Sequence, residues 1–142
     1  MLVALLFLGV PAYLKWYLEQ NDRSTIAALP RLADAQETYR TNYGQYAPSL
    51  AALGPPPAGA SVSAAHANLI DAALAAGARS GFSFTYQASD RDNDGRADSY
   101  TVSASPFAIG SSGQAYYFLD ESKQIRRSAE GAATASSPMI PK

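Results

Sequence analysis

The segment DRDNDGRAD, which begins at Asp90, gathers the carboxylates whose spacing could bind a metal ion. Asp90, Asp92 and Asp94 occupy alternate positions and a glycine follows them, as in the first half of an EF-hand calcium loop. Ca²⁺ prefers several oxygen ligands, and alternate residues of a tight loop can converge on one ion. The backbone carbonyl of Arg96 and the carboxylate of Asp98 come next in the chain as candidate ligands. The spacing therefore predicts a calcium site in this segment.

A hairpin loop without a metal ion accounts for the same residues. Thr101 stands where an EF-hand has a bidentate glutamate, and no helix is expected on either side of the segment. Four aspartates and two arginines give the segment a net charge of −2, which lowers its affinity for a cation. In this interpretation Asn93, Asp94 and Gly95 provide the turn geometry, and the charged side chains are solvated. The calcium site and the plain turn are both kept as hypotheses.

The composition argues against catalysis and against nucleic-acid binding. The chain has 142 residues, enough for one modest domain with an appendage, and its 11 basic and 12 acidic residues give a net charge of −1. A nucleic-acid-binding protein normally has a surplus of basic residues. Cysteine is absent, which removes disulfides, thiol catalysis and cysteine-bound metals. The single histidine, His66, is expected on the exposed side of a helix, and no G-x-S-x-G sequence occurs, so neither an enzyme nor an organic cofactor is expected.

A long helix with two bends is predicted over residues 1–44. Pro11 and Pro30 each lack an N–H and press on the carbonyl four residues earlier, so a kink or local unwinding is expected at each. Residues 1–14 carry no charge, but as a helix they cover roughly 21 Å, less than the ~30 Å of a bilayer core. Apolar residues recur along one face of this helix at spacings near three and four: Leu14, Leu18, Ile26, Leu29, Leu32, Ala35 and Tyr39.

Two short helices are predicted after the long one. Gly44 is expected to end the long helix in a left-handed conformation. The sequence PSLAAL, at residues 48–53, indicates one turn of helix, and ANLIDAALAAG, at residues 67–77, indicates a second helix. The residues expected to share a face of this second helix are Leu69, Ala73 and Ala76.

Four antiparallel strands are predicted beyond Gly81, where the apolar period changes from helical to alternating. Phe82, Phe84 and Tyr86 alternate with polar residues, which is typical of a half-buried strand. The other three predicted strands lie in SYTVSA, in QAYYFLD and in QIRRS. A long N-terminal hydrophobic helix packed on a small four-stranded antiparallel sheet is an α+β fold. We expect three regions: the helix at 1–44, a globular head at 45–128 and a flexible tail at 129–142.

The junction between the long helix and the head carries a family resemblance. The sequence TNYG at 41–44 and the sequence PSLAALG at 48–54 resemble the T-x-Y-G helix end and the P-S-L-x-x-L-G turn of short type IV pilins and type II secretion pseudopilins. Pro11, 33 residues before Gly44, fits the proline of the hydrophobic helix in that family. The strand segments resemble the sheet of the same group, so the resemblance covers almost the whole chain.

The resemblance implies a structural subunit that polymerises through its N-terminal helix into a helical extracellular type IV pilus-like filament. It implies an inner-membrane precursor, other copies of the chain and an assembly machinery as partners, and no nucleic acid. Some pseudopilins use a calcium ion to hold the end of the sheet where other pilins use a disulfide, so the resemblance is consistent with the calcium hypothesis for the acidic segment. The residues that the resemblance assigns to assembly are Leu2, Leu5, Leu6, Phe7, Leu8, Gly9, Val10, Pro11, Leu14 and Leu18.

The chain departs from the family at its start. The family has a basic leader, a cleaved glycine and a glutamate in the first turn, and none of these precedes Pro11 here. If Pro11 aligns, about a dozen residues are missing before Met1. We therefore expect Met1 to be an internal methionine of a longer chain, or the chain to be a pilin-like protein that is never processed.

Two other functions remain open at this stage. The first is a major pseudopilin of a type II secretion system, which forms a short periplasmic pseudopilus. The second is a monomeric, membrane-anchored domain that binds Ca²⁺ or another ligand. An apolar stripe on the helix beyond the membrane favours a filament, because a monomer would leave the stripe exposed.

A tyrosine-rich corner follows the helix at residues 39–46 and is closed by Pro48 and by the prolines at 55–57. Because proline restricts the chain, this corner would hold the head at a fixed angle to the helix. An ordinary solvated loop is the alternative.

Overall fold

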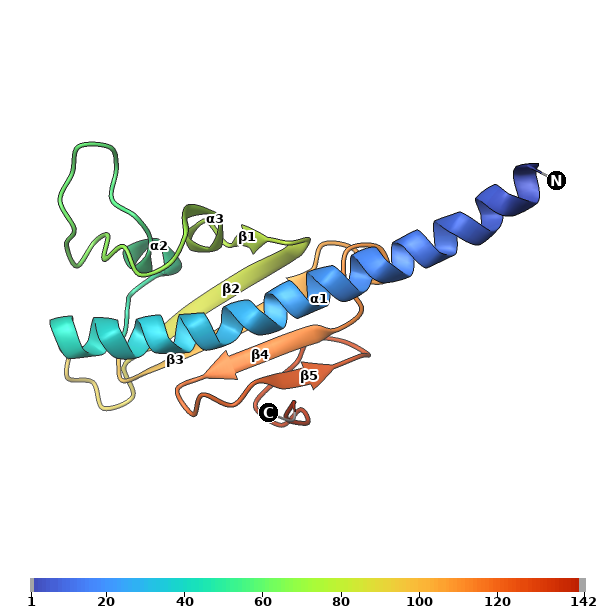
Figure 1. Ribbon diagram of the computed structural model, residues 1–142. Helices are drawn as coiled ribbons and strands as arrows, with labels where there is room; N and C mark the ends of the chain where they lie inside the picture. Colours follow the sequence, from blue (N-terminus) through green and yellow to red (C-terminus); the bar gives the residue numbers. More distant parts are fainter. Residues whose placement is uncertain (1, 141–142) are drawn as a thin grey trace.

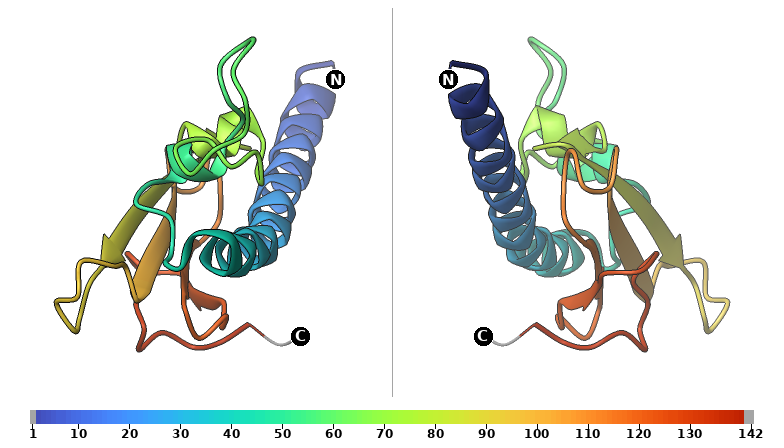
Figure 2. Two further views of the ribbon diagram at one scale, coloured as in Figure 1. Left: turned by 90° about the vertical axis from the view of Figure 1, so that its left-hand side faces the viewer. Right: turned by 90° about the vertical axis from the view of Figure 1, so that its right-hand side faces the viewer.

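A long helix, α1 (Leu2–Tyr43), lies across one face of an antiparallel sheet in this computed structural model, which describes residues 2–140 and the side chains of residues 12–140 (Figure 1). Figure 2 shows the helix as one layer and the sheet as the other. The predicted α+β class, the long helix and the antiparallel sheet are confirmed. The predicted strand number is wrong, because the sheet has five strands.

The sheet follows the chain order without a crossover, and every neighbouring pair is antiparallel. The missed strand is the first one, which contains only two residues and is too short for any alternation to be visible in the sequence. It pairs with the second strand through a two-residue turn, Ser80-Gly81, whose φ angles of 53° and 78° are those of a type I′ hairpin. The strands are β1 (Ala78–Arg79), β2 (Phe82–Ser89), β3 (Ser99–Pro106), β4 (Tyr116–Asp120) and β5 (Arg126–Ser128).

The core lies between α1 and the sheet. The alternation predicted for β2 is confirmed, since Phe82 and Phe84 are buried and Thr85 is exposed. On α1, Leu29 and Leu32 are fully buried and belong to the same hydrophobic cluster as the β2 side chains. Burial of such side chains contributes on the order of 1.5–3 kcal/mol each, so this contact orients the helix on the sheet.

The predicted apolar stripe of α1 is buried except at its beginning and at Ile26, which is partly buried. Leu18 retains only 7% of its exposed surface, whereas Leu14 retains 39%. The helix is continuous through Pro30, which lies on its exposed side, so the predicted local unwinding is absent there. The ribbon curves along its length in Figure 2, as expected of a helix that is convex toward solvent. The side chain of Pro11 lies outside the described residues.

The end of α1 and the following turn match the prediction. Gly44 has a φ of 77° and donates its N–H to the carbonyl of Arg40 at 2.8 Å. Ser49 caps the helix α2 (Leu50–Leu53), because its hydroxyl accepts the N–H of Ala52 at 3.2 Å. The left-handed glycine and the helical turn were predicted from the sequence, and the structure adds the serine cap.

The second predicted helix is wrong in length and in its buried face. Only α3 (Ala72–Ala75) is helical, and it buries Leu74 rather than Ala73. Asp71 caps it by accepting the N–H of Leu74 at 2.8 Å. Before this cap the chain is irregular, because the N–H groups of residues 67–69 donate to carbonyls of α2 and of the residue after it, and not to carbonyls of a helix of their own. His66 lies in this stretch, bridged to Ser63 and half-buried, and not in a helix.

The residues after β5 are placed along that strand up to residue 140. The N–H of Arg127 donates to the carbonyl of Pro138 at 2.9 Å, and the N–H of Ile140 donates to the carbonyl of Ile125 at 2.8 Å. Ala133 is buried. The sequence predicts a loose tail here; the described part of the tail runs back along the sheet edge, where unpaired β5 backbone groups offer hydrogen bonds.

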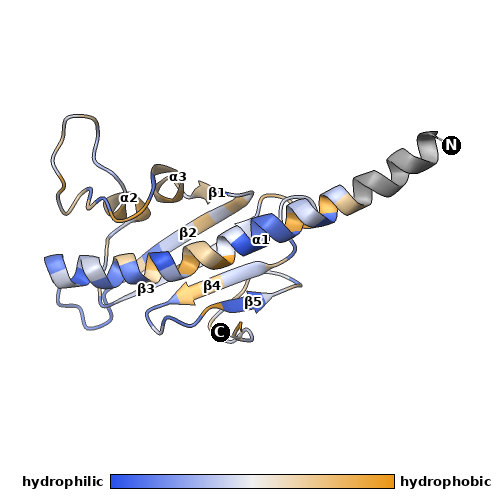
Figure 3. Cartoon of the chain, viewed as in Figure 1, coloured by the Kyte–Doolittle hydropathy of each residue, from blue (hydrophilic) through white to orange (hydrophobic). Residues whose placement is uncertain are grey.

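Hydropathy along α1 is mixed in the described part of the chain, where hydrophilic and hydrophobic residues alternate around the helix (Figure 3). Among the described residues, no helix combines the length and the apolar character that crossing a membrane requires.

Candidate functional site

The acidic loop, residues 90–98, connects β2 to β3 and projects beyond the sheet (Figure 2). The ladder between the two strands closes with the pair Ser89 and Ser99, and the N–H of Asp98 donates to the carbonyl of Ser89 at 3.0 Å. The strands therefore fix both ends of the loop, while the loop itself is exposed to solvent.

Three of the four predicted aspartates meet in the loop. Asp90, Asp92 and Asp98, the acidic triad, each bring one carboxylate oxygen within 4.8 Å of the other two. Asp94 lies outside this group, and its Oδ1 accepts the N–H of Arg96 at 2.8 Å. This local turn uses the carboxylate of Asp94 to support the backbone of the loop.

Backbone N–H groups hold the carboxylates of the triad in place. The carboxylate of Asp90 accepts the N–H of Gly95 at 2.7 Å and that of Asp94 at 3.2 Å. The carboxylate of Asp98 accepts the N–H of Arg91 at 3.1 Å and that of Asp92 at 3.2 Å. Hard oxygen donors gathered in this way fit Ca²⁺, whose six to eight ligands would be completed by loop carbonyls and water. The residues present thus fit the ion predicted from the sequence.

The pKa values of two aspartates of the triad shift in opposite directions. A hydrogen bond to Asp90 is the main reason that the pKa of Asp92 is raised. Desolvation raises the pKa of Asp90, but hydrogen bonds from Gly95, Asp92 and Asp94 outweigh it and lower the pKa overall. The guanidinium of Arg91 is turned away to Glu121, with an N–O distance of 3.0 Å, so it does not neutralise the triad.

The start of the described part of α1 exposes aromatic side chains on one face. Tyr13, Trp16 and Tyr17, here called the aromatic face, are 66%, 56% and 37% exposed. The ring of Tyr13 lies 6.2 Å from that of Trp16 and 6.5 Å from that of Tyr17. Large apolar side chains grouped on a surface are typical of interaction sites, so the aromatic face is a candidate contact surface.

The other residues that the resemblance assigned to assembly divide into two groups. Leu14 is exposed beside the aromatic face, and Leu18 is buried. The remaining eight have side chains outside the described residues: Leu2, Leu5, Leu6, Phe7, Leu8, Gly9, Val10 and Pro11.

Two buried polar residues of α1 were missed by the sequence interpretation. Asp22 accepts the N–H of Gln114 at 2.9 Å and the hydroxyl of Tyr117 at 2.7 Å. Gln36 is fully buried and bonds to Tyr86 and Ala47. The sequence gives no signal for either, because aspartate and glutamine on a helix are mostly exposed. Together they fasten α1 to the sheet at two points.

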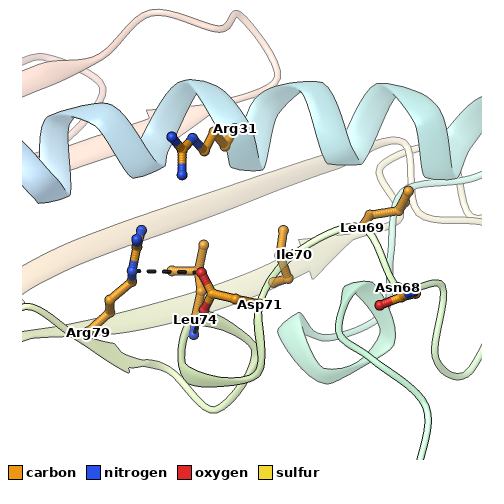
Figure 4. A pocket seen from close by; sticks show the side chains of 7 residues that line it. All are labelled: Arg31, Asn68, Leu69, Ile70, Asp71, Leu74 and Arg79. Carbon is orange, nitrogen blue, oxygen red and sulfur yellow. Dashed lines mark hydrogen bonds and ion pairs between the residues drawn. The ribbon is translucent and has the colours of Figure 1, made fainter.

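A cleft lies between α1 and the segment that includes α3 and β1 (Figure 4). Its volume is about 320 Å³. Arg31 extends into it from α1, and Arg79 enters from β1, where its Nε lies 3.7 Å from Oδ2 of Asp71. The apolar lining includes Ile70 and the buried Leu74. This arginine cleft was not predicted, since its residues come from three separate parts of the sequence.

No protein-family model, curated protein or solved structure matches this chain.

Proposed function

We propose that this chain is the structural subunit of a helical filament of the type IV pilus kind, and that it polymerises through α1. The observation that carries the proposal is the division of this helix into two parts. From Leu18 to Tyr39 its apolar stripe is buried against the sheet of the same chain. Before Leu18 the aromatic face is exposed and has no cover within the described chain. A surface of this kind is suited to packing against other subunits.

The attachment of the head to the helix supports a structural role. Tyr39 donates its hydroxyl to the carbonyl of Ala64 at 2.6 Å, and Tyr46 packs edge-on against Tyr100 with ring centroids 4.9 Å apart. With the bonds of Asp22 and Gln36, these contacts hold the head at one angle to α1. A filament subunit needs such rigidity, because a variable angle between helix and head would prevent the same contact from repeating between successive copies.

The proposal includes a route to the filament. The uncharged residues 1–14 would hold the precursor in the inner membrane, and an assembly machinery would transfer it to an extracellular filament. The partner in the filament is a second copy of the chain. A short periplasmic pseudopilus of a type II secretion system uses the same packing, and the lengths of the filaments in electron micrographs separate these two outcomes.

A monomeric, membrane-anchored binding domain is the competing function. The acidic triad favours the binding-domain function, since three clustered carboxylates can bind Ca²⁺ in a single copy of the chain. We propose that the triad binds Ca²⁺ within the filament subunit, where the ion would hold the end of the β2–β3 hairpin. Three carboxylate oxygens within 4.8 Å of one another are the observation behind this assignment.

Substitution of the aromatic face tests the filament proposal. In the full chain, Tyr13→Ser combined with Trp16→Ser should abolish filaments in negative-stain micrographs and in sedimentation. The matched control is Lys15→Gln, whose side chain is 75% exposed and pairs with Glu19 away from the aromatic face. Filaments of normal length and diameter from the serine variant would exclude assembly through this surface, and a monomeric wild-type chain would favour the binding domain.

A further inference from the structure

The arginine cleft presents positive charge that the described chain does not neutralise. Arg31 has no ion-pair partner among the described residues. Arg79 has only the long contact to Asp71, so the three charged side chains give the cleft a net charge of +1. Ile70 and Leu74 contribute the apolar part of the lining, while Arg31 is exposed and Arg79 is half-buried. Such a site favours a carboxylate that can reach into it, because guanidinium binds carboxylate with paired, charge-assisted hydrogen bonds.

The chain carries a matching carboxylate at the tip of the acidic loop. Asp94 is exposed and lies outside the acidic triad. Its Oδ1 accepts the N–H of Arg96, and its Oδ2 has no hydrogen-bond donor among the described residues. The neighbours Asn93 and Gly95 have φ angles of 62° and 84°, so the chain turns sharply at this point. A Cβ atom added to Gly95 would meet nothing within 4 Å, which shows that the tip faces open space.

We propose that the carboxylate of Asp94 of one copy enters the arginine cleft of a second copy and bonds to Arg31 and Arg79. The proposal rests on the filament function and names a contact between the heads. Within one copy the acidic loop and the segment of α3 and β1, which forms one wall of the cleft, lie on different sides of the molecule (Figures 1 and 2). The contact therefore joins two different surfaces, and a contact of this type repeats from copy to copy instead of closing a two-fold dimer.

Charge complementarity selects this occupant. The acidic loop has a net charge of −2 and the cleft has a net charge of +1. The two arginines of the loop do not oppose docking at its tip, because Arg91 is engaged with Glu121 and Arg96 extends toward Gly44, whose added Cβ would lie 3.9 Å from its Nη1. Because the triad excludes Asp94, the loop can hold a cation and dock at the same time.

Disulfide trapping tests the contact in the full chain, and the absence of native cysteine keeps the experiment free of background. Arg96→Cys places a thiol beside the loop tip, and Ala73→Cys places one on the exposed side of α3, next to the cleft. A disulfide requires Cα atoms within about 7 Å, so only docked copies can be linked. We expect the double-cysteine chain to form a ladder of covalent multimers upon oxidation of the filaments. The control pair Ala73→Cys with Ala58→Cys, in the exposed segment 57–60, should give no ladder.

Further substitutions in the double-cysteine chain identify the carboxylate. Asp94→Asn should remove the ladder, whereas Asp92→Asn, which alters the triad, should retain it. Asp94→Arg should also remove it, and adding Arg31→Glu and Arg79→Glu should restore it through reversed charges.

Filaments that give no ladder, or a ladder that survives Asp94→Asn, would overturn the docking contact and leave the filament function in place. Absence of filaments from the unmodified chain would overturn both. An acidic segment of another protein is the alternative occupant of the cleft. In that case oxidised filaments give no ladder, and Arg31→Glu weakens binding to that protein. This result would also overturn the contact between copies.

Discussion

The side chain of Gln36, fully buried on α1, donates from Nε2 to the hydroxyl of Tyr86 on β2 at 2.7 Å. Its Oε1 accepts the N–H of Ala47 at 2.9 Å, and the hydroxyl of Tyr86 donates in turn to the carbonyl of Ala47. These three bonds form a closed triangle between the helix, the turn after it and the sheet. Low local polarity makes such a network strong when complete and costly when one member is missing. This network is therefore one of the contacts that fix the angle between helix and head.

Replacing Gln36 by leucine should destabilise the protein by about 1–3 kcal/mol, because the N–H of Ala47 is left buried without an acceptor. Urea unfolding of the full chain measures this loss. Thr38→Ala, at an exposed position of the same helix, should change stability by less than about 0.5 kcal/mol. The effects of Gln36→Leu and Tyr86→Phe should not add, since both break the same triangle; strict additivity would contradict the network.

Buried tyrosines should make the protein sensitive to alkali. Burial raises the pKa of Tyr86 to about 12, and it also raises the pKa of Tyr100 and of Tyr117. The folded state thus holds these protons more tightly than the unfolded chain, whose tyrosines titrate at about pH 10. The stabilisation is complete below pH ~10 and is lost as the pH rises through the folded values, with a limiting slope of about 1.4 kcal/mol per pH unit for each tyrosine. Unfolding in urea between pH 8 and pH 12 should show this decline.

Tyr100→Phe separates the tyrosine effect from a general alkaline effect. The hydroxyl of Tyr100 is buried without a hydrogen-bond partner among the described residues. Its removal should therefore leave stability at pH 7 unchanged or slightly higher, and should reduce the loss at pH 11. Tyr13→Phe, at an exposed ring, is the control and should follow the wild-type curve. A Tyr100→Phe profile identical to wild type would exclude this source of alkali sensitivity.

Calcium should stabilise the protein through the acidic triad. Binding to the folded state alone contributes RT ln(1 + [Ca²⁺]/Kd), about 2.7 kcal/mol at a hundredfold excess over Kd. For a chain of this size the melting temperature should rise by roughly 5–10 °C. Thermal unfolding in chelator and in millimolar Ca²⁺ measures the shift. Asp92→Asn should abolish it, while Asp94→Asn, outside the triad, should retain it. Coincident wild-type curves in the two buffers would leave the segment as a plain turn.

Gly113 should not tolerate a side chain. A Cβ atom at this position would lie 2.4 Å and 2.6 Å from two ring carbons of Phe82, which is fully buried and cannot move aside. We expect Gly113→Ala to cost about 1–3 kcal/mol in urea unfolding. Ser111→Ala, exposed in the same connection, should be nearly neutral. A stable Gly113→Ala variant would show that the connection before β4 can shift away from the ring.

The sequence by itself determined the elements whose signals are local. The apolar stripe of α1, the alternation in β2 and the left-handed glycine at the end of α1 each report a constraint within a few residues, and the structure agrees with all three. The acidic loop was located in the same way. Spacing along one strand or one turn of helix is enough to decide which side chains share a face.

Only the tertiary structure decided the features that depend on distant partners. Residues 67–70 are not helical because their N–H groups donate to carbonyls of α2 and of Gly54, although their composition favours a helix. Gln36 and Asp22 are buried because acceptors and donors on the sheet and its connections satisfy them, and the arginine cleft forms where α1 passes β1. In the acidic loop, three aspartates bring their carboxylates together in the triad. The carboxylate of Asp94 instead accepts the N–H of Arg96 and lies outside the triad. Hydrogen bonds between segments far apart in the chain override local propensity, since an unsatisfied buried polar group costs more than a few residues of lost helix.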